Sequence, residues 1–469
     1  MTLSREPRMQ WGDLPVAYDF AALKADPAKA AYAQADFRSK GVSLATKMRS
    51  AWHILKGGRK YQAVDRTFAE RFRAKIIPAF IVETSAAMTE DWSGLAPPVL
   101  LEKLNYWMER TLVDFARDSL KPTVFAAGSL ANLQRMLEKP LGAETARNVA
   151  AELSMGARPD AGADLPAALK QVASGAINKA QFVEGFGHRG SYEMELSAPR
   201  WAEDERALDE VLETARKGGR NAITAGFAEM VDEVLKQVGG DAILSGVAKR
   251  ANLATPQILA IRNELPKLHT ALGLRETGKH HLLRGYALIR RALVELDRRF
   301  GLNGGIFFLT PDELHRLVNG EDLSSFIVER RKRRAISLSL EAPPVIFSDD
   351  LEAIGRPAPP PAAADVLRGV SLSAGVAEGP AMVLTDPRAA APALTEFILV
   401  CPSTDPSWVP LFARARGLIM ETGGVLSHGA IVAREFGLPA VAGLPGIVRR
   451  LRTGQRVRVD GSNGTVAIA

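Results

Sequence analysis

The spacing of apolar residues changes once along this chain, near residue 341, and the change separates two kinds of structure. Up to about residue 335 apolar residues recur at steps of three and four, the period of a helix with one buried face. PPVLLEKLNYWMERTLVDFARDSL and KHHLLRGYALIRRALVELDRRF follow this period throughout. Beyond residue 365 short β-branched and apolar runs predict strands. We therefore expect a multidomain protein with a mostly α-helical N-terminal region and a C-terminal α/β domain.

Turn-forming residues mark the boundaries of these parts. MGARPDAGADLP, at 155–166, interrupts the helical region with a loop. EAPPVIFSDDLEAIGRPAPPPAAAD, at 341–365, is rich in proline and alanine and favours an extended, semi-rigid spacer. The expected division is a helical domain at 1–340, a Pro/Ala-rich linker at 341–365 and a compact α/β domain at 366–469. A hinge-like linker between two folded units suggests relative movement.

The C-terminal domain has a clear order of predicted elements. The expected strands are AMVLTD, EFILVCP, GLIME, AVAG and the pair RVRVDG and GTVAIA, separated by turn residues. One helix, 428–436, lies among them. Strands that alternate with a helix in this way are typical of an α/β fold.

Composition and charge place the chain among ordinary globular proteins. With 469 residues it is too long for one typical core, and its formal charge is +7. The basic run ERRKRRA, at 329–335, has no interleaved aromatic residues, which favours a solvated helix end over a nucleic-acid surface. A lone cysteine, Cys401, argues against disulfides. The absence of an apolar leader or a membrane-length apolar run leads us to expect a cytoplasmic location.

One histidine stands in an unusual setting, ETGGVLSHGAIVAREFGLPAVAG at 421–443. Ser427 is a good N-cap for the helix that follows, and the glycines before it allow a bulky group to approach the main chain. The first turn of a helix carries unpaired N–H groups that attract anions. A phosphoryl group on His428 would meet these N–H groups, and a neutral imidazole is a competent nucleophile.

The residues alone leave a second interpretation open. A lone histidine is more often a surface or core residue whose hydrogen bonds are satisfied, and glycine pairs before helices often serve simple turning. An anion site at a helix start permits phosphoryl binding without proving it. Phosphohistidine and structural histidine are therefore about equally supported by the motif alone.

A resemblance favours the phosphohistidine. GGVLSHGAIVAREFGLPAV, with RGVSLSAGVAEGPAMVL, STDPSWVPLFARARGLIMETGG and GQRVRVDGSNGTV, resembles the swivelling phosphohistidine domain of the phosphoenolpyruvate-utilising enzymes over about the last hundred residues. The resemblance implies that His428 carries a phosphoryl group between two active sites, cradled by Gly423, Gly424, Ser427 and Gly429. Leu426 replaces the regulatory threonine of the dikinases in this family, so we expect no such regulation here.

The helical region resembles the acceptor domain of rifampicin phosphotransferase-type proteins. The resemblance lies in FVEGFGHRGSYEMELSAPRWAED, LRETGKHHLLRGYALIRRALVELDRRFGL and GGIFFLTPDEL. It implies that Arg275 and Lys279 face the incoming phosphohistidine. Four residues apart on a helix, the two cations share one face and could stabilise a transferring phosphoryl group, and Lys279 could also accept a proton. The alternative for both is a solvated helix with a local ion pair.

Further acceptor-pocket candidates follow from the same segments. They are His188, Arg189 and Glu193, near Glu195, and the pair His280 and His281. For the first group a buried polar network that fixes a loop is an equally good interpretation. For the histidine pair the expectation is a place at the rim of the pocket.

Two parts of the family's larger enzymes find no counterpart in the sequence: the ATP-grasp domain and the barrel that binds phosphoenolpyruvate. We therefore expect a split phosphotransferase, in which a separate ATP-grasp subunit, holding ATP and Mg²⁺, phosphorylates His428. This chain would then phosphorylate a hydroxyl or enolate of a small organic molecule, with no metal bound to itself. The alternatives are a non-catalytic or degenerate relative acting as a ligand-binding or scaffold protein, and a pure phosphocarrier. An enclosed pocket facing Lys279 would favour an acceptor site over a carrier.

Overall fold

The computed structural model describes residues 67–154, 157–218, 244–249, 253–339, 366–387, 396–405, 408–412, 414–424 and 427–468, with two short strands, β1 (Val16–Ala17) and β2 (Asp36–Phe37). The expected linker at 341–365 and Leu426 lie outside the described residues. Apart from β1 and β2, the described part before residue 340 is helical, and the strands of a second sheet follow residue 365. The multidomain fold expected from the sequence is confirmed.

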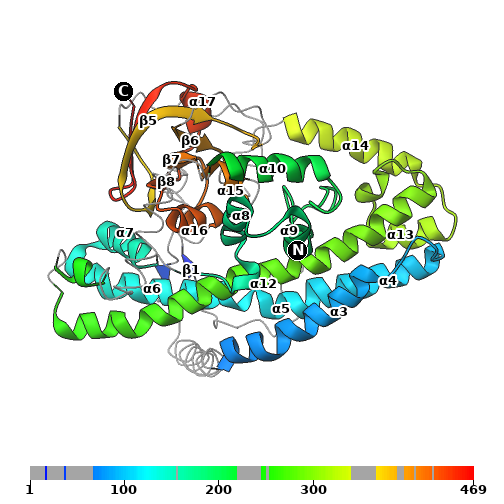
Figure 1. Ribbon diagram of the computed structural model, residues 1–469, viewed down its shortest axis with the longest axis horizontal. Helices are drawn as coiled ribbons and strands as arrows, with labels where there is room; N and C mark the ends of the chain where they lie inside the picture. The colour runs from blue at the N-terminus through cyan, green and yellow to red at the C-terminus, as the bar shows by residue number, and fades with distance from the viewer. Residues whose placement is uncertain are drawn as a thin grey trace.

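A single helix of 46 residues, α12 (Thr255–Phe300), runs the length of the helical region (Figure 1). Its buried face packs against α3, α4 and α6, and their apolar side chains form one core. The described helices before α12 are η2 (Phe72–Ile76), α3 (Ile77–Thr89), α4 (Pro97–Glu109), η3 (Arg110–Phe115), α5 (Ala116–Ser119), α6 (Lys121–Leu141), α7 (Ala143–Leu153), η4 (Ala161–Ala163), α8 (Leu165–Ser174), α9 (Lys179–Phe186) and α10 (Glu205–Gly218). After it come η5 (Gly305–Phe308), α13 (Pro311–Val318) and α14 (Ser324–Ser339). No helix among the described residues combines the length and apolarity needed to cross a membrane.

The C-terminal domain is built on an eight-stranded sheet with the order β3-β10-β9-β5-β6-β7-β8-β4. The central strands β5, β6, β7 and β8 are parallel, and the other pairs are antiparallel. The strands are β3 (Val366–Arg368), β4 (Val370–Ser373), β5 (Val376–Val383), β6 (Phe397–Cys401), β7 (Ala415–Met420), β8 (Ala440–Ala442), β9 (Arg456–Asp460) and β10 (Thr465–Ile468). The helices are α15 (Val409–Phe412), α16 (His428–Glu435) and α17 (Ile447–Arg450). The strands expected from the sequence form, and β3 and β4 are added.

Alternate residues of β6 enter two different cores, as the pleat of a strand requires. Phe397, Leu399 and Cys401 face α15 and α16, whereas Ile398 and Val400 face a second core with α17. The first core does not end at the C-terminal domain. It continues into α8, α9 and α10 of the helical region, and α10 packs against α15. Figure 1 shows α8 and α10 between the sheet and α12. The two regions are therefore docked through a continuous apolar contact.

One glycine sets how closely the chain approaches the middle of α12. A Cβ built on Gly273 would lie 2.0 Å from the main-chain oxygen of Arg158, in the loop before η4. This separation is far below van der Waals contact, and the neighbouring atom is backbone, so a side chain here would push the loop away from the helix.

We expect Gly273→Ala to lower the free energy of unfolding by about 1–3 kcal/mol, because the added methyl overpacks this crossing. Gly185→Ala is the matched control, since it lies in α9 with nothing within 4 Å of its Cβ and gains about 1 kcal/mol of helix propensity. Urea unfolding followed by circular dichroism measures both. Equal stability of the two variants would contradict the close approach.

Candidate functional site

The start of α16 has the geometry that the sequence predicts for it. Ser427 is the N-cap, and its Oγ accepts the N–H of Ala430 at 3.3 Å. His428 is the first residue of the helix, so its main chain belongs to the turn whose N–H groups have no partner within the helix. The predicted N-cap is confirmed, and the helix start is suited to an anion.

Strands β6 and β7 pair in parallel, and α16 is the next helix in the chain after β7. The loop after β6 packs directly on α16, because a Cβ on Gly429 would lie 2.4 Å from Oγ1 of Thr404. Gly423 is also confined, with the Met420 methyl 3.0 Å from its virtual Cβ, whereas Gly424 has nothing within 4 Å. A side chain at 429 would therefore push the loop after β6 away from α16.

On the helical region, the centre of the site is a buried carboxylate. Glu193 lies in the 187–203 loop between α9 and α10 and is 2% exposed. Its Oε2 accepts Arg189 Nε at 2.6 Å, and its Oε1 accepts Arg189 NH2 at 3.2 Å. Lys279 Nζ, from α12, lies 2.5 Å from the same Oε1. A buried charge of this kind is stable only when it is fully paired, and here two cations pair it.

The charge on Glu193 follows from the balance of these contacts. Burial alone would raise the pKa of its carboxyl, but Arg189 and Lys279 outweigh burial and lower that pKa to about 2. The carboxylate is therefore ionised at neutral pH. Lys279 itself keeps 25% of its side chain exposed, so it remains accessible beside its partner.

Arg275 precedes Lys279 by one helical turn. Its NH1 donates to Oε1 of Glu276 at 2.8 Å, and 22% of its side chain is exposed. Both residues lie in α12, four apart and so on one helix face, while their side chains pair with different carboxylates. Arg275 and Lys279 together form a cationic strip on α12.

The 187–203 loop also touches the C-terminal domain. The main-chain N–H of Tyr192 donates to Oδ2 of Asp405 at 3.2 Å. Asp405 follows Thr404, which packs on Gly429 at the start of α16, and Tyr192 precedes Glu193, which holds Lys279. The contact between Tyr192 and Asp405 thus joins the loop that holds Lys279 to the loop that packs on the start of α16.

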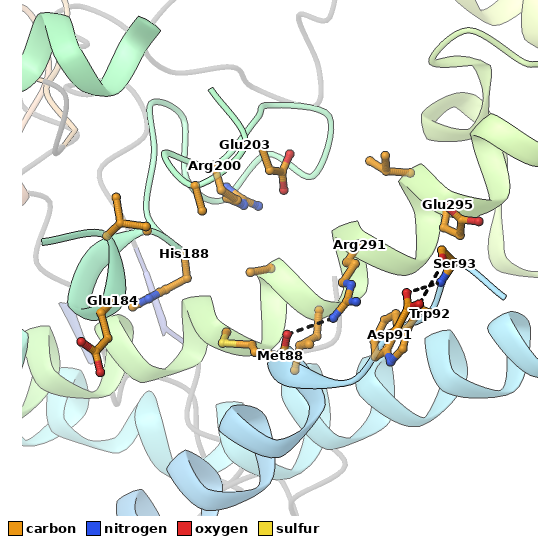
Figure 2. Close-up of a pocket in the computed structure, with 16 residues that line it drawn as sticks. Met88, Asp91, Trp92, Ser93, Glu184, His188, Arg200, Glu203, Arg291 and Glu295 are labelled. Atoms are coloured by element: carbon orange, nitrogen blue, oxygen red, sulfur yellow. Dashed lines mark hydrogen bonds between the residues drawn. The ribbon is translucent and has the colours of Figure 1, made fainter. Parts of the chain in front are cut away.

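A cavity of about 650 Å³ lies between the 187–203 loop, α12 and the end of α3. Its wall is largely apolar, with Met88, Trp92 and Val183, and it carries charged groups at both ends (Figure 2). Arg291 closes one end: its guanidinium lies over the Trp92 ring and donates to main-chain oxygens of 87, 88 and 90. The volume is that of a typical small-molecule site.

Of the sequence candidates for the acceptor pocket, His188 lines this cavity. Arg189 and Glu193 form the buried ion pair behind it, and Lys279 is not among the lining residues. The cavity lies further along α12, where Ala287 is its nearest residue to Lys279 in the sequence. The helical region thus has a cavity of ligand size, but this cavity does not face Lys279 as expected from the sequence.

His280 and His281 do not lie on the cavity wall. His188 Nε2 lies 3.0 Å from the main-chain oxygen of His280 and donates to it, and the two rings meet edge to face. Burial lowers the pKa of His188 and of His280 well below 6.5, and burial with Arg284 lowers that of His281 to about 4. All three imidazoles are neutral at pH 7. Nδ1 of His280 and of His281 is buried without a hydrogen-bond partner.

Sequence reasoning missed the residues that frame these groups. Arg200 is 1% exposed and donates through NH1 to the main-chain oxygen of Glu193 at 2.8 Å. Tyr192 and Asp405, which join the two regions, were likewise not singled out. The sequence signal for a buried Arg200 was an arginine between a proline and a tryptophan. For Tyr192 and Asp405 no local pattern exists, because the two residues are more than two hundred positions apart.

Comparison with known proteins agrees with this geometry. Residues 394–464, which include β6 to β9 and α16, match the family described as PEP-utilising enzyme, mobile domain. The resemblance stated from the sequence is confirmed for this domain.

Particular relatives extend the similarity into the helical region. Rifampicin phosphotransferase of Streptomyces sviceus is 31% identical over 295 residues, which cover 61% of this chain and 34% of that protein. The prodigiosin synthesizing transferase PigC of Serratia marcescens is 28% identical over 61% of this chain and 33% of its own length. The uncharacterized phosphotransferase YvkC of Bacillus subtilis is 42% identical over 100 residues, 21% of this chain and 12% of that protein. The chain therefore aligns with about a third or less of each relative's length.

We expect Glu193→Gln to destabilise the protein by about 3 kcal/mol at pH 7, because it leaves Arg189 and Lys279 beside a neutral group. Because the pKa of Glu193 is lowered in the folded protein, its contribution to the free energy of unfolding is complete above pH 4.5 and is lost as the pH falls toward 2. The difference from wild type, measured by urea unfolding at several pH values, should shrink over that range. Glu329→Gln, at an exposed ion pair, should cost under about 0.5 kcal/mol. A pH-independent difference for Glu193→Gln would contradict the ionised pair.

Proposed function

We propose that this chain is the transferring component of a phosphotransferase. His428 receives a phosphoryl group that originates from ATP and passes it to a hydroxyl or enolate of a small organic acceptor bound in the helical region. The observation that carries this proposal is the contact of Tyr192 with Asp405, because Asp405 lies in the loop that packs on the start of α16 and Tyr192 precedes Glu193, which holds Lys279. The match to a PEP-utilising mobile domain and to named phosphotransferases supports the same chemistry.

Phosphoryl transfer is accelerated mainly by positive charge that stabilises the phosphoryl oxygens, and it requires no further nucleophile from the protein. The phosphorus–nitrogen bond to His428 breaks and its electron pair returns to the imidazole, while a phosphorus–oxygen bond forms to the acceptor. The hydroxyl proton passes to solvent, and an enolate has none to lose. Arg275 and Lys279 neutralise the charge on the moving phosphoryl oxygens. Because Lys279 is paired with the buried carboxylate of Glu193, we assign it the role of a charge clamp.

An acceptor of small organic type fits the cavity beside His188. Its volume of about 650 Å³ and its mostly apolar wall suit a drug-sized molecule with few charges. Two relatives are named for rifampicin and for prodigiosin, which are organic compounds. A pure phosphocarrier would need no cavity of this size, so the volume supports an acceptor site, although Lys279 does not line the cavity.

The phosphoryl donor completes the proposal. We propose that an ATP-grasp domain on a separate subunit, with ATP and Mg²⁺, phosphorylates His428, and that the pair acts in the cytoplasm. The docked apolar contact between α10 and α15 would then open so that His428 can reach that subunit. A non-catalytic ligand-binding or scaffold protein is the alternative, and it predicts no phosphorylation at all.

The direct test incubates the chain with β-³²P-labelled ATP, with and without a candidate ATP-grasp protein from the same organism. We expect acid-labile, base-stable label on the wild type with the partner present, and none on His428→Ala. Label on wild type without any partner would overturn the split arrangement. Absence of label with an active partner would overturn the phosphotransfer proposal and support a binding protein.

A second prediction separates loading from delivery. We expect Lys279→Met to load His428 at the wild-type rate but to slow discharge to an acceptor by about 10²–10³-fold, the usual loss for one electrostatic contact in a transition state. Rapid-quench kinetics on the loaded protein, with rifampicin among a panel of hydroxyl compounds, would measure it. Lys332→Met, an exposed lysine of α14, is the control. Equal slowing of loading and discharge by Lys279→Met would contradict the clamp.

A further inference from the structure

The 187–203 loop is held in a fixed shape by many contacts on the helical region. Arg200 donates to the main-chain oxygens of Glu193 at 2.8 Å and Glu195 at 3.5 Å. Arg290 donates to that of Leu196 at 2.7 Å. The N–H of Trp201 returns to the main-chain oxygen of Arg189 at 2.7 Å, and so ties the two arms together. These contacts fix the two arms of the loop, and the tip at Tyr192 lies between them.

Its tip is strained. Tyr192 has φ of +52°, a left-handed conformation that a non-glycine residue adopts rarely and at a cost. Strain of this kind persists only where surrounding contacts fix the chain, and it is common at functional sites. In this conformation the Tyr192 N–H meets Asp405 of the C-terminal domain, while the next side chain, Glu193, is buried against Lys279.

These contacts form an unbroken line from one domain to the other. Lys279 pairs with Glu193, Glu193 follows Tyr192, and Tyr192 binds Asp405. On the far side, Asp405 follows Thr404, whose Oγ1 would lie 2.4 Å from a Cβ on Gly429, the neighbour of His428. The residue that contacts Asp405, Tyr192, is therefore directly bonded to the residue that pairs with Lys279, Glu193.

We propose that the 187–203 loop couples docking of the C-terminal domain to the alignment of Lys279, with Asp405 as the docking contact and Glu193 as the positioning residue. When Asp405 leaves, the Tyr192 tip relaxes and Glu193 no longer holds Lys279 in place. The cation is then set for phosphoryl transfer only while the His428 domain is docked. This inference rests on the proposed function, and it adds control of the delivery step to it.

The test measures the reactivity of Lys279 directly, by mass spectrometry after brief acetylation of the full chain with an N-hydroxysuccinimide ester. In the wild type the ion pair to Glu193 protects Lys279. We expect Asp405→Ala to raise its acetylation rate several-fold, toward the rate in Glu193→Gln. Asp405→Asn keeps an oxygen that accepts from Tyr192, so it should restore most of the protection. Lys332, exposed on α14, reports any general change in reactivity.

Two results separate this inference from the proposed function. If Glu193→Gln exposes Lys279 and Asp405→Ala leaves it at the wild-type rate, the coupling is wrong. A parallel arm treats the same variants with phosphoramidate, a small-molecule phosphoryl donor to histidine, and maps label on His428. Failure of His428 to accept the group would overturn the proposed function, while the Lys279 reactivities would still decide the coupling.

Discussion

The pairing of the Glu193 carboxylate with Arg189 and Lys279 is the interaction on which the rest of the site depends. A carboxylate buried this deeply would be neutral without its cations, and the cations would be free to turn to solvent without it. The pair holds Lys279 on the exposed side of α12 and fixes the loop at the same time. Everything proposed for the helical region starts from this buried charge.

The apolar core shared by the two regions is not directional, unlike the ion pair of Glu193. It joins α8, α9 and α10 to the sheet through contacts that are broad and not directional, so it can hold the domains together without specifying an orientation. The polar contact between Asp405 and Tyr192 adds the direction. This combination of a broad apolar contact and one directional hydrogen bond suits a domain that docks and leaves, as we propose for the one that carries His428.

Much of this arrangement could be predicted from the sequence because it is local. The period of three and four along α12, the N-cap at Ser427 and the strands of the C-terminal domain each follow from residues within a few positions of one another. The docking contacts could not be predicted, because Tyr192 and Asp405 are distant in sequence and neither belongs to a motif. The place of the cavity was also hidden, since Trp92 and Arg291 meet only when α3 packs on α12.

The most direct test of the central claim is the ³¹P resonance of phosphohistidine on the full chain, loaded with phosphoramidate, in wild type and in Lys279→Met. A phosphoryl group that docks beside an ammonium has a different environment from one in water, so we expect the resonance to shift in Lys279→Met. It should stay unchanged in Lys332→Met. An identical resonance in all three proteins would mean that the phosphoryl group on His428 does not meet Lys279.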